Sequence, residues 1–443
     1  MALAFAVIFG CAHSPDEARP KLTQLEQAQS YIRQGDPQRA LPLLAALERA
    51  SPDSLEIARL KTEAYVRAGR AAELTAELQS HPPSRAATHY SLALIYAASS
   101  AHPDHGAADA CAQLEAAIAL SPSEAELHYR LGLVLLSLNR PEQALGPLRR
   151  AIELDGQRTA PFLPLAQALH QVGRNGEALT ALADWARRRP PEAELTVAKG
   201  VMNELAPPFS GMPKSAEPLF FQAAAILEEQ DDPFGAIALL QQLARAHPRA
   251  AAVHALLALC HRRLDDAPQA IDELREAIAL APSDGRSQQY LAEVYFERKQ
   301  LAQAKSAFLR AIELNPLLEH AHLALAQLAL DESDLSGARE HLTVAASLHP
   351  SSEVRSKLAT VLELSGAYAE SIKELEAIQR LQPDNPTWAL RLGLLHLREH
   401  RHAASLEASE RSRAEAARWL REVLRLQSDN VTAATALRAL EGS

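Results

Sequence analysis

A repeat with a period of about 34 residues constrains the fold of this chain more than any other feature of its sequence. Prolines and one glycine mark the period: Pro122, Gly156 and Pro190 in one series, and Pro248, Pro282, Pro316 and Pro350 in another. Four segments that contain or precede these markers are also alike, EAAIALSP, RAIELDG, REAIALAP and LRAIELNP. A period of this length is typical of proteins built from stacked units, in which each unit packs only against its neighbours.

Within one period, the apolar residues predict two amphipathic helices. Residues 285–318 place a first apolar stripe on Leu291, Ala292 and Tyr295, and a second on Ala304, Phe308 and Ala311. The spacings of three and four residues are those of one helix face. The alanines predict close packing of the two helices, because a longer side chain would not fit there.

Turn signals separate the two helices of a unit. Examples are Gly35-Asp36-Pro37, Asn139-Arg140-Pro141, Asp231-Asp232-Pro233 and Asp265-Asp266-Ala267-Pro268. Asp or Asn can cap the second helix while proline occupies its first turn. We therefore expect each of these segments to start a helix.

Composition favours an all-α protein. Hydrophobic residues make up 47% of the chain, enough for a large core, whereas aromatic residues make up only 5%. Alanine, leucine, glutamate, glutamine and arginine dominate, and they favour helix over strand. With 45 basic against 55 acidic residues, the net charge of −10 offers no overall positive field for a phosphate backbone, so we expect no nucleic-acid partner.

The small and large apolar residues of each unit resemble the tetratricopeptide repeat family. The match is close at Gly132, Leu135, Ala144, Leu148 and Ala151, and again at Ala324, Leu325, Ala326, Ala338, Leu342 and Ala345. The resemblance implies an all-α fold, a right-handed α-solenoid of about eleven helix pairs. It also implies a concave groove, lined by the first helix of every unit, that binds a protein or an extended peptide.

The family's inward-facing positions correspond here to eleven residues of mixed character. They are Tyr129, Gln167, His170, Phe221, Glu228, Arg262, Arg263, Gln289, Glu293, Phe296 and Gln327. Relatives that hold carboxylates use lysine, arginine and asparagine at these positions, but all six asparagines of this chain fall in turns or near helix ends. Arg262 and Arg263 are candidates for an acidic partner, and Phe221, Phe296 and Tyr129 for apolar side chains.

The regular spacing is interrupted once over a long stretch. The interval from Pro190 to Pro248 is longer than one period and shorter than two, which predicts an extra helix near 192–205 and a proline-rich loop with Phe209 and Met212 as exposed candidates. We expect five parts: a signal-like segment and tether at 1–20, a repeat segment at 21–192, the interruption at 193–216, a second repeat segment at 217–430 and a capping helix at 431–443. Shorter insertions lie at 101–106 and 400–412.

The first eleven residues, MALAFAVIFGC, form an uncharged apolar stretch that ends in Gly10-Cys11. This resembles the end of a bacterial lipoprotein signal peptide, which implies a lipid on Cys11 and a periplasm-facing protein anchored to the cell envelope membrane. The segment lacks a preceding Lys or Arg, and Phe9 stands where a smaller residue is usual. The missing charge is accounted for if Met1 is an internal methionine and a basic region lies upstream of it. The alternative is a frayed cytoplasmic N-terminus with an incidental cysteine.

The usual signatures of catalysis are absent from the chain. It contains no phosphate-binding loop, no dinucleotide fingerprint, no nucleophile elbow and no HEXXH pair. His396, His400 and His402 can share a helix face, and His102 and His105 share a loop, but neither set has a third metal ligand at a convincing spacing. We therefore expect neither an enzyme, nor a cofactor, nor a metal site.

Two functional hypotheses follow from the sequence. The first is a non-enzymatic scaffold, lipid-anchored in the bacterial envelope, that holds protein partners during assembly, secretion or export. The second is a cytoplasmic adaptor or regulatory module that recruits an enzyme or binds a signalling peptide. The repeat and the missing catalytic motifs suit both hypotheses, whereas Gly10-Cys11 favours the first.

Overall fold

The computed structural model describes residues 23–80, 84–98, 103–206, 211–402 and 405–441. Throughout these ranges the regular secondary structure is helical, and no strand occurs among the described residues. Within the same ranges, twenty-four helices, α2 to α25, form eleven consecutive pairs with α12 and α25 as single helices. The predicted all-α repeat solenoid of about eleven pairs is therefore confirmed.

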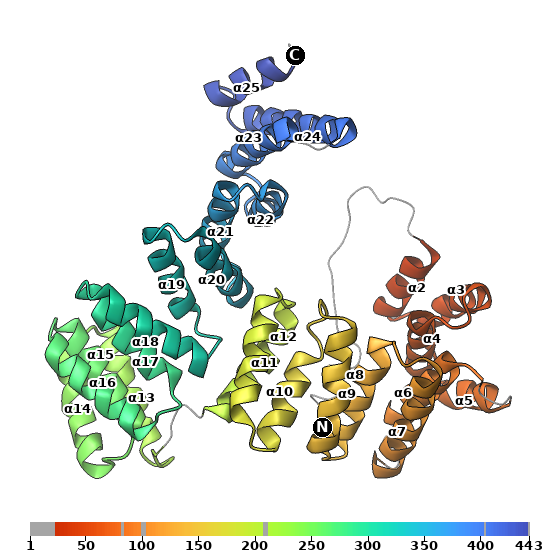
Figure 1. Cartoon of the computed structure of the whole chain (residues 1–443), viewed down its shortest axis with the longest axis horizontal. Helices are drawn as coiled ribbons and strands as arrows, with labels where there is room; N and C mark the ends of the chain where they lie inside the picture. The colour runs from red at the N-terminus through yellow and green to blue at the C-terminus, as the bar shows by residue number, and fades with distance from the viewer. Residues whose placement is uncertain (1–22, 81–83, 99–102, 207–210, 403–404, 442–443) are drawn as a thin grey trace. The chain divides into compact units, whose positions relative to one another are not determined.

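The chain divides into two compact units, Met1–Leu182 and Ala183–Ser443, here called unit 1 and unit 2. The boundary falls inside helix α11. Unit 1 holds five pairs, which Figure 1 draws from red to yellow-green: α2 (Gln24–Arg33) and α3 (Pro37–Ala50), α4 (Leu55–Arg67) and α5 (Ala71–Gln79), α6 (Ala86–Ala98) and α7 (Pro103–Leu120), α8 (Ala125–Ser137) and α9 (Pro141–Leu154), α10 (Phe162–Gln171) and α11 (Asn175–Arg187).

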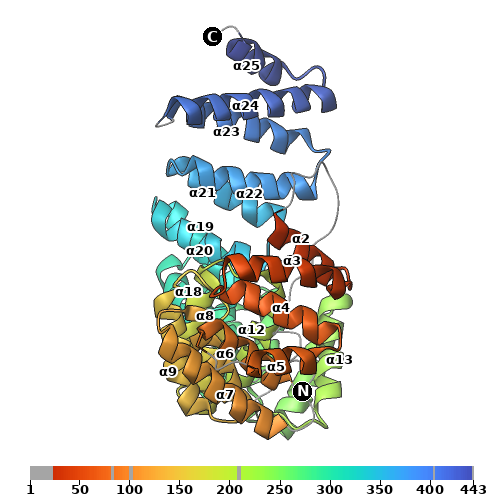
Figure 2. The ribbon, with the colours of Figure 1, turned by 90° about the vertical axis from the view of Figure 1, so that its right-hand side faces the viewer.

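Unit 2 begins with the end of α11 and the single helix α12 (Glu192–Leu205). Its pairs are α13 (Glu217–Glu229) and α14 (Pro233–Ala246), α15 (Ala251–Arg263) and α16 (Ala267–Leu280), α17 (Gly285–Glu297) and α18 (Leu301–Leu314), α19 (Glu319–Asp331) and α20 (Leu335–Leu348), α21 (Ser352–Leu364) and α22 (Tyr368–Leu381), α23 (Pro386–His402) and α24 (Leu406–Leu426). Helix α25 (Val431–Glu441) ends it, and Figure 2 shows α21 to α25 stacked in successive layers.

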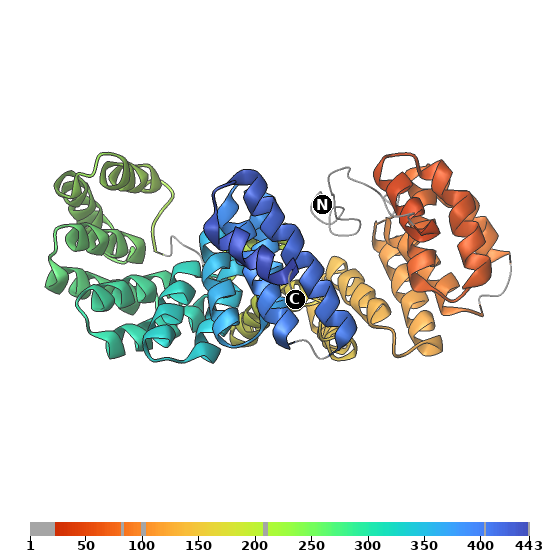
Figure 3. The same ribbon diagram turned by 90° about the horizontal axis from the view of Figure 1, so that it is seen from above.

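The core repeats with the sequence period. A small side chain at the same place of the second helix is fully buried in most pairs, as in Ala144, Ala178, Ala236, Ala270, Ala304 and Ala338. The first helix can also require a small residue. At Gly132 on α8, a Cβ would clash with the side chain of Leu148 on α9. Seen from above in Figure 3, the helices drawn from green to cyan lie side by side in succession.

The turns between paired helices share one backbone conformation. The second residue after the end of the first helix has positive φ in nine of the described turns, at Gly35, Gly69, Asn139, Gly173, Asp231, Asp265, Lys299, Ser333 and Gly366. Asp232 and Asp266 then cap the second helix as predicted, accepting hydrogen bonds from backbone N–H groups. The capping role predicted for Asp36 and Asn139 is wrong, because Asp36 pairs with the Arg39 side chain and Asn139 occupies the left-handed position.

The predicted interruption contains α12 and a loop that returns to α13. Residues 207–210, Phe209 among them, lie outside the described residues. Met212 is not exposed, contrary to the sequence prediction: its side chain is 9% exposed and belongs to the apolar cluster of α13 to α15. Gly211, with φ of +81°, allows this packing, since a Cβ there would overlap the carbonyl oxygen of Arg249.

Two arginines, one at the end of α11 and one just after it, pair with later helices of unit 2. Arg187 Nε donates to Glu340 of α20 over 3.0 Å, and Arg189 donates to the buried Glu374 of α22 over 2.6 Å. The two units therefore meet at 182–183, inside α11. Both arginines come from a basic run for which the repeat pattern has no counterpart.

The last helix pair is longer than the others. Helices α23 and α24 have 17 and 21 residues, whereas α21 and α22 have 13 and 14. The additional turns come from the predicted insertion at 400–412 and extend the end of α23 and the start of α24. None of the described helices is both long enough and apolar enough to span a membrane.

Candidate functional site

The predicted groove residues of unit 1 lie on its first helices, but they are not equally accessible. Tyr129 is only 4% exposed, because the guanidinium carbons of Arg130 and Arg158 lie 5.6 Å and 4.8 Å from its ring centre. Gln167 and His170 on α10 are half-buried, and His170 Nδ1 lies 3.0 Å from the Asn175 side-chain oxygen. Tyr129 thus serves as a platform for arginines, and its ring is closed to an apolar partner.

In unit 2 the structure brings three predicted residues of α15 and α17 together, and a fourth, Arg263, bonds to other residues. Arg262 forms an ion pair with Glu293, and Gln289 donates a 2.8 Å hydrogen bond to the same carboxylate. Arg263 pairs with Asp231 and donates to the carbonyl of Leu227 at 3.1 Å. Both arginines are therefore engaged by acidic or carbonyl groups of their own unit.

The other predicted residues of unit 2 are dispersed. Phe221 is 51% exposed and meets Phe220 edge to face, with ring centres 5.9 Å apart, while Glu228 lies exposed on the same helix. Phe296 packs partly into the cluster around Phe308. Gln327 is exposed and donates to Asp331 at 2.9 Å. These residues form no common site.

A cluster that the sequence analysis missed connects α6 and α8 of unit 1. Tyr90, which is fully buried, donates a 2.6 Å hydrogen bond to Glu126, and Arg130 Nε donates to the same oxygen over 2.6 Å. Arg158, from the turn before α10, pairs with the other oxygen of Glu126. We call Tyr90, Glu126, Tyr129, Arg130 and Arg158 the Glu126 cluster.

The Glu126 cluster holds its carboxylate charged. Burial raises the pKa of Glu126, but Arg130, Arg158 and the Tyr90 hydroxyl lower it by more, so that the pKa lies below the ordinary value. Burial raises the pKa of Tyr90, so its hydroxyl stays a donor. Two guanidinium groups around one carboxylate leave an excess of one positive charge.

A second arrangement of the same kind lies next to it on α4. Glu63, which is 5% exposed, pairs with Arg59 at 3.5 Å and with Arg67 at 2.8 Å, one helical turn before and after it. Arg59 also acts electrostatically on the Tyr90 hydroxyl, which links this Glu63 set to the Glu126 cluster. The Glu63 set and the Glu126 cluster together hold four arginines against two glutamates.

The spacing of these residues was a signal that the sequence analysis did not use. Arg59, Glu63 and Arg67 are four residues apart, as are Glu126 and Arg130, which is the spacing of ion pairs on a helix. Nothing in the sequence indicated that Arg158, which comes almost one repeat after Glu126, closes the cluster. That contact depends on how the pairs stack.

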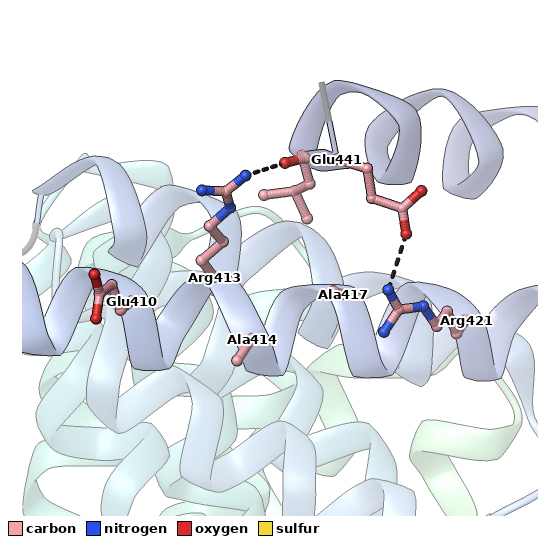
Figure 4. A pocket seen from close by; sticks show the side chains of 7 residues that line it. Glu410, Arg413, Ala414, Ala417, Arg421 and Glu441 are labelled. Carbon is pink, nitrogen blue, oxygen red and sulfur yellow. Dashed lines mark hydrogen bonds and ion pairs between the residues drawn. The ribbon is translucent and has the colours of Figure 1, made fainter. Parts of the chain in front are cut away.

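Two shallow pockets lie at the end of unit 2. One, of about 390 Å³, lies between α24 and α25, and Figure 4 shows Arg413 and Arg421 bonded to the C-terminal helix on either side of Ala414 and Ala417. Arg421 donates to Glu441 at 2.9 Å. The other, of about 600 Å³, lies between the turn at 366–370 and the added turns of α23 and α24.

The histidines considered for a metal do not converge. His396 is buried, His400 Nδ1 lies 2.7 Å from the Ser409 hydroxyl, and the His402 ring leans on Tyr368 with ring centres 5.7 Å apart. Within the described residues, no group of three or more histidine, cysteine or acidic side chains is placed to hold a metal ion. His102, the side chain of His105, and Cys11 lie outside the described part of the chain.

A comparison with protein families decides what kind of array this is. A family model described as tetratricopeptide repeat matches residues 25–73, 105–159, 221–285, 291–353 and 357–417, more than half of the chain. The chain belongs to the tetratricopeptide repeat family. Tetratricopeptide repeats are modules for protein–protein interaction, and the protein is a scaffold of that type.

Solved structures of tetratricopeptide repeat (TPR) proteins are similar to this chain at low identity. They include YrrB, described as a TPR protein with an unusual peptide-binding site (16% identity, 45% of this chain and 97% of that one, TM-score 0.35), and the TPR domain of P58(IPK) (17%, 81% and 97%, TM-score 0.25). A third is the APC/C hetero-tetramer Cut9-Hcn1 (13%, 94% and 96%, TM-score 0.32). No curated protein matches the chain. The family assignment therefore rests on the repeat itself.

Proposed function

We propose that this TPR protein is a non-enzymatic scaffold whose unit 1 binds an acidic segment of a protein partner. The observation that carries the proposal is the pairing of each buried glutamate, Glu63 and Glu126, with two arginines. The four guanidinium groups are held in place by these glutamates and by the Tyr129 ring. Since two glutamates balance only two of the four charges, the surface favours carboxylates.

The arginines remain accessible enough to meet such a partner. The side chains of Arg59 and Arg158 are 28% and 29% exposed, so their guanidinium groups are partly desolvated and still reach the surface. Arginine presents five N–H donors in a plane, more than one carboxylate uses. A partner segment with two or more Asp or Glu residues would pair with Arg59 and with Arg158.

Binding of a labelled peptide tests this assignment. Fluorescence anisotropy of the full chain with a fluorescein-labelled Asp/Glu-rich peptide should show binding that weakens as salt rises, and the matching Asn/Gln peptide should bind at least about tenfold more weakly. Arg59→Gln should reduce affinity for the acidic peptide by about tenfold. Arg150→Gln on α9, which removes an exposed arginine paired only with Glu153, is the matched control. Equal binding of both peptides, or equal losses in both variants, would refute the assignment.

We further propose that the scaffold is tethered to the outside of a bacterial membrane by a lipid on Cys11. The support is the sequence alone: an uncharged apolar stretch that ends at Gly10-Cys11 and continues into a polar segment with two prolines. A lipid anchor adds about 0.8 kcal/mol for every methylene buried in the membrane. The scaffold would then present unit 1 to envelope proteins during assembly, secretion or export.

Cell fractionation tests the tether separately from peptide binding. In bacteria that express the protein from its native upstream DNA, the membrane fraction should contain a lipid-bearing peptide that begins at Cys11, and mass spectrometry should identify it. Cys11→Ser should abolish this peptide and release the protein. A soluble wild-type protein that retains residues 1–10 would instead favour the cytoplasmic adaptor.

A further inference from the structure

The larger pocket of unit 2 exists because the last helix pair departs from the regular length. Its lining comes from the turn at 366–370 and from side chains on the added turns of the pair, Glu399, His402, Ala408 and Ser412. A pair of ordinary length would end before these turns and leave the surface open. We call this pocket, of about 600 Å³, the α22–α24 recess.

The recess combines aromatic walls with two carboxylates. The ring of Tyr368, from the turn, meets the ring of His402, from the end of α23, with centres 5.7 Å apart and planes inclined by 31°. Glu370 and Glu399 supply the carboxylates, and their side chains are 42% and 29% exposed. Such a combination suits a flat cation, which gains from ring faces and from an opposite charge together.

The two carboxylates differ in what already occupies them. Both oxygens of Glu370 accept from Arg339 Nη2 of α20 at 2.9 Å, so a cation of this unit already neutralises that group. Glu399 accepts a 2.8 Å hydrogen bond from the Ser412 hydroxyl at Oε2, and its other near neighbour is the His396 imidazole. Across the described ranges, no lysine or arginine lies within ion-pair distance of Glu399. Of the two carboxylates, Glu399 is therefore the one that no lysine or arginine neutralises.

The imidazole of His396, next to Glu399, makes no hydrogen bond with any described residue. His396 is 7% exposed, its Nδ1 atom lies 3.3 Å from Oε2 of Glu399, and neither ring nitrogen makes a hydrogen bond of acceptable geometry. A buried polar group without a partner is costly, and native structures leave few of them. Both contacts of Glu399 fall on Oε2, so its other oxygen, Oε1, is the one that a ligand can meet.

We propose that the α22–α24 recess binds the side chain of an arginine presented by a protein partner. The guanidinium group pairs with Glu399 and lies against the rings of Tyr368 and His402, while its methylene stem contacts Ala367 and Ala408. Arginine suits the recess better than lysine because its planar group can stack on a ring and meet both oxygens of one carboxylate. This site is independent of the acidic-peptide site on unit 1.

A peptide titration with matched variants tests the proposal on the full chain. The probe is a short Gly/Ser peptide with one central arginine, and the comparison peptides carry citrulline, the neutral isostere, or lysine at that position. Ligand-observed NMR should show saturable binding of the arginine peptide, with binding at least about tenfold weaker for citrulline and measurably weaker for lysine. Equal binding of the arginine and citrulline peptides, or of the arginine and lysine peptides, would overturn the assignment.

Variants locate the binding in the recess. Glu399→Gln should weaken the arginine peptide by about tenfold, and Tyr368→Leu, which keeps an apolar side chain but removes the ring, by about threefold. Glu407→Gln on α24 is the control, because Glu407 is exposed and lies outside the recess. Circular dichroism melting of each variant separates loss of binding from loss of fold. Unchanged binding in folded Glu399→Gln, or the same loss in Glu407→Gln, would place the site elsewhere. Failure of the acidic peptide to bind unit 1 would leave this result untouched.

Discussion

The hydroxyl of Tyr90 on α6 donates a 2.6 Å hydrogen bond to the carboxylate of Glu126 on α8, and so joins two neighbouring helix pairs of unit 1. Glu126→Gln should destabilise unit 1 by about 3 kcal/mol, because Arg130, whose side chain is only 11% exposed, would be left without its counter-charge. Hydrogen exchange of peptides from α6 and α8 measures the change. Glu153→Gln on α9 is the control and should cost less than about 0.5 kcal/mol, since its pair with Arg150 is exposed.

The same carboxylate should make unit 1 sensitive to acid. Because the pKa of Glu126 is lower in the folded protein than its ordinary value of 4.5, its stabilisation is complete above pH 4.5 and is lost as the pH falls through the folded pKa. The Glu126→Gln variant should lack this part of the acid dependence of exchange in α6 and α8. Parallel acid profiles for the two proteins would show that Glu126 is not charged in the fold.

Two glycines of one helix pair should respond oppositely to alanine. Gly132→Ala should destabilise unit 1 by about 1–3 kcal/mol, because the new methyl group must displace Leu148. Gly146→Ala on α9 should stabilise it by up to about 1 kcal/mol, since its surroundings are open and alanine favours helix. Thermal melting with exchange of α8 and α9 gives both values. Similar shifts in the two variants would contradict the close packing of α8 on α9.

The positive-φ turn offers a stabilising substitution in unit 2. Lys299 has φ of +59° at the position that glycine fills in four other turns, and Lys299→Gly should therefore stabilise by about 0.5–1 kcal/mol. In the reverse direction, Gly69→Ala should cost about 1 kcal/mol through backbone strain alone, because no atom lies near the added methyl group. Denaturation followed by exchange of α17 and α18 reports the first effect. A loss of stability in Lys299→Gly would exclude the left-handed turn.

A buried histidine pair should destabilise unit 2 in mild acid. Burial, together with His341 3.2 Å away, lowers the pKa of His322 to about 3, although the hydrogen bond to the Pro316 carbonyl opposes both. A pKa depressed from 6.5 means that the full stability is present above pH 6.5 and declines below it, by about 2 kcal/mol at pH 5.

Exchange of α19 and α20 between pH 7 and pH 5 measures this decline. The groups around the pair are Arg187 and Lys305, which favour the neutral imidazoles, and Glu340 and Asp334, which oppose them. His322→Gln should flatten the pH profile whatever its effect on stability itself. His320→Gln, on the exposed side of the same helix, should retain the wild-type slope. Equal slopes in all three proteins would rule out His322 as the titrating group.

Features that recur with the repeat period were predictable because local packing alone imposes them. Ala292, Ala304 and Ala311 are fully buried in one cluster, as the apolar stripes required. Asp232 and Asp266 cap their helices for the same local reason. The prediction for Asn139 was wrong because asparagine suits two neighbouring positions, the N-cap and the left-handed residue before it. Asn139 occupies the left-handed position.

Features that depend on contacts between pairs were not predictable. Tyr129 lies in the first-helix position that the family pattern gives it, yet Arg130 and Arg158 cover it, and the second of these comes from the following unit. Met212 became buried because Gly211 lets the loop approach Arg249. The insertion at 400–412 was visible in the sequence. The recess was not, because it forms only where the turn at 366–370 lies opposite the added turns of α23 and α24.

The fully buried alanines that recur at the same place in so many pairs make the interfaces nearly interchangeable, and a partly folded chain could therefore stack the wrong units together. Ion pairs that differ from one boundary to the next distinguish correct neighbours: Lys61 with Glu48 and Glu77, Arg149 with Glu177, and Arg391 with Glu363. A misplaced unit would bury apolar surface equally well but leave these charges unmatched. Apolar burial thus stabilises the stacking of the units, and the ion pairs specify which units are neighbours.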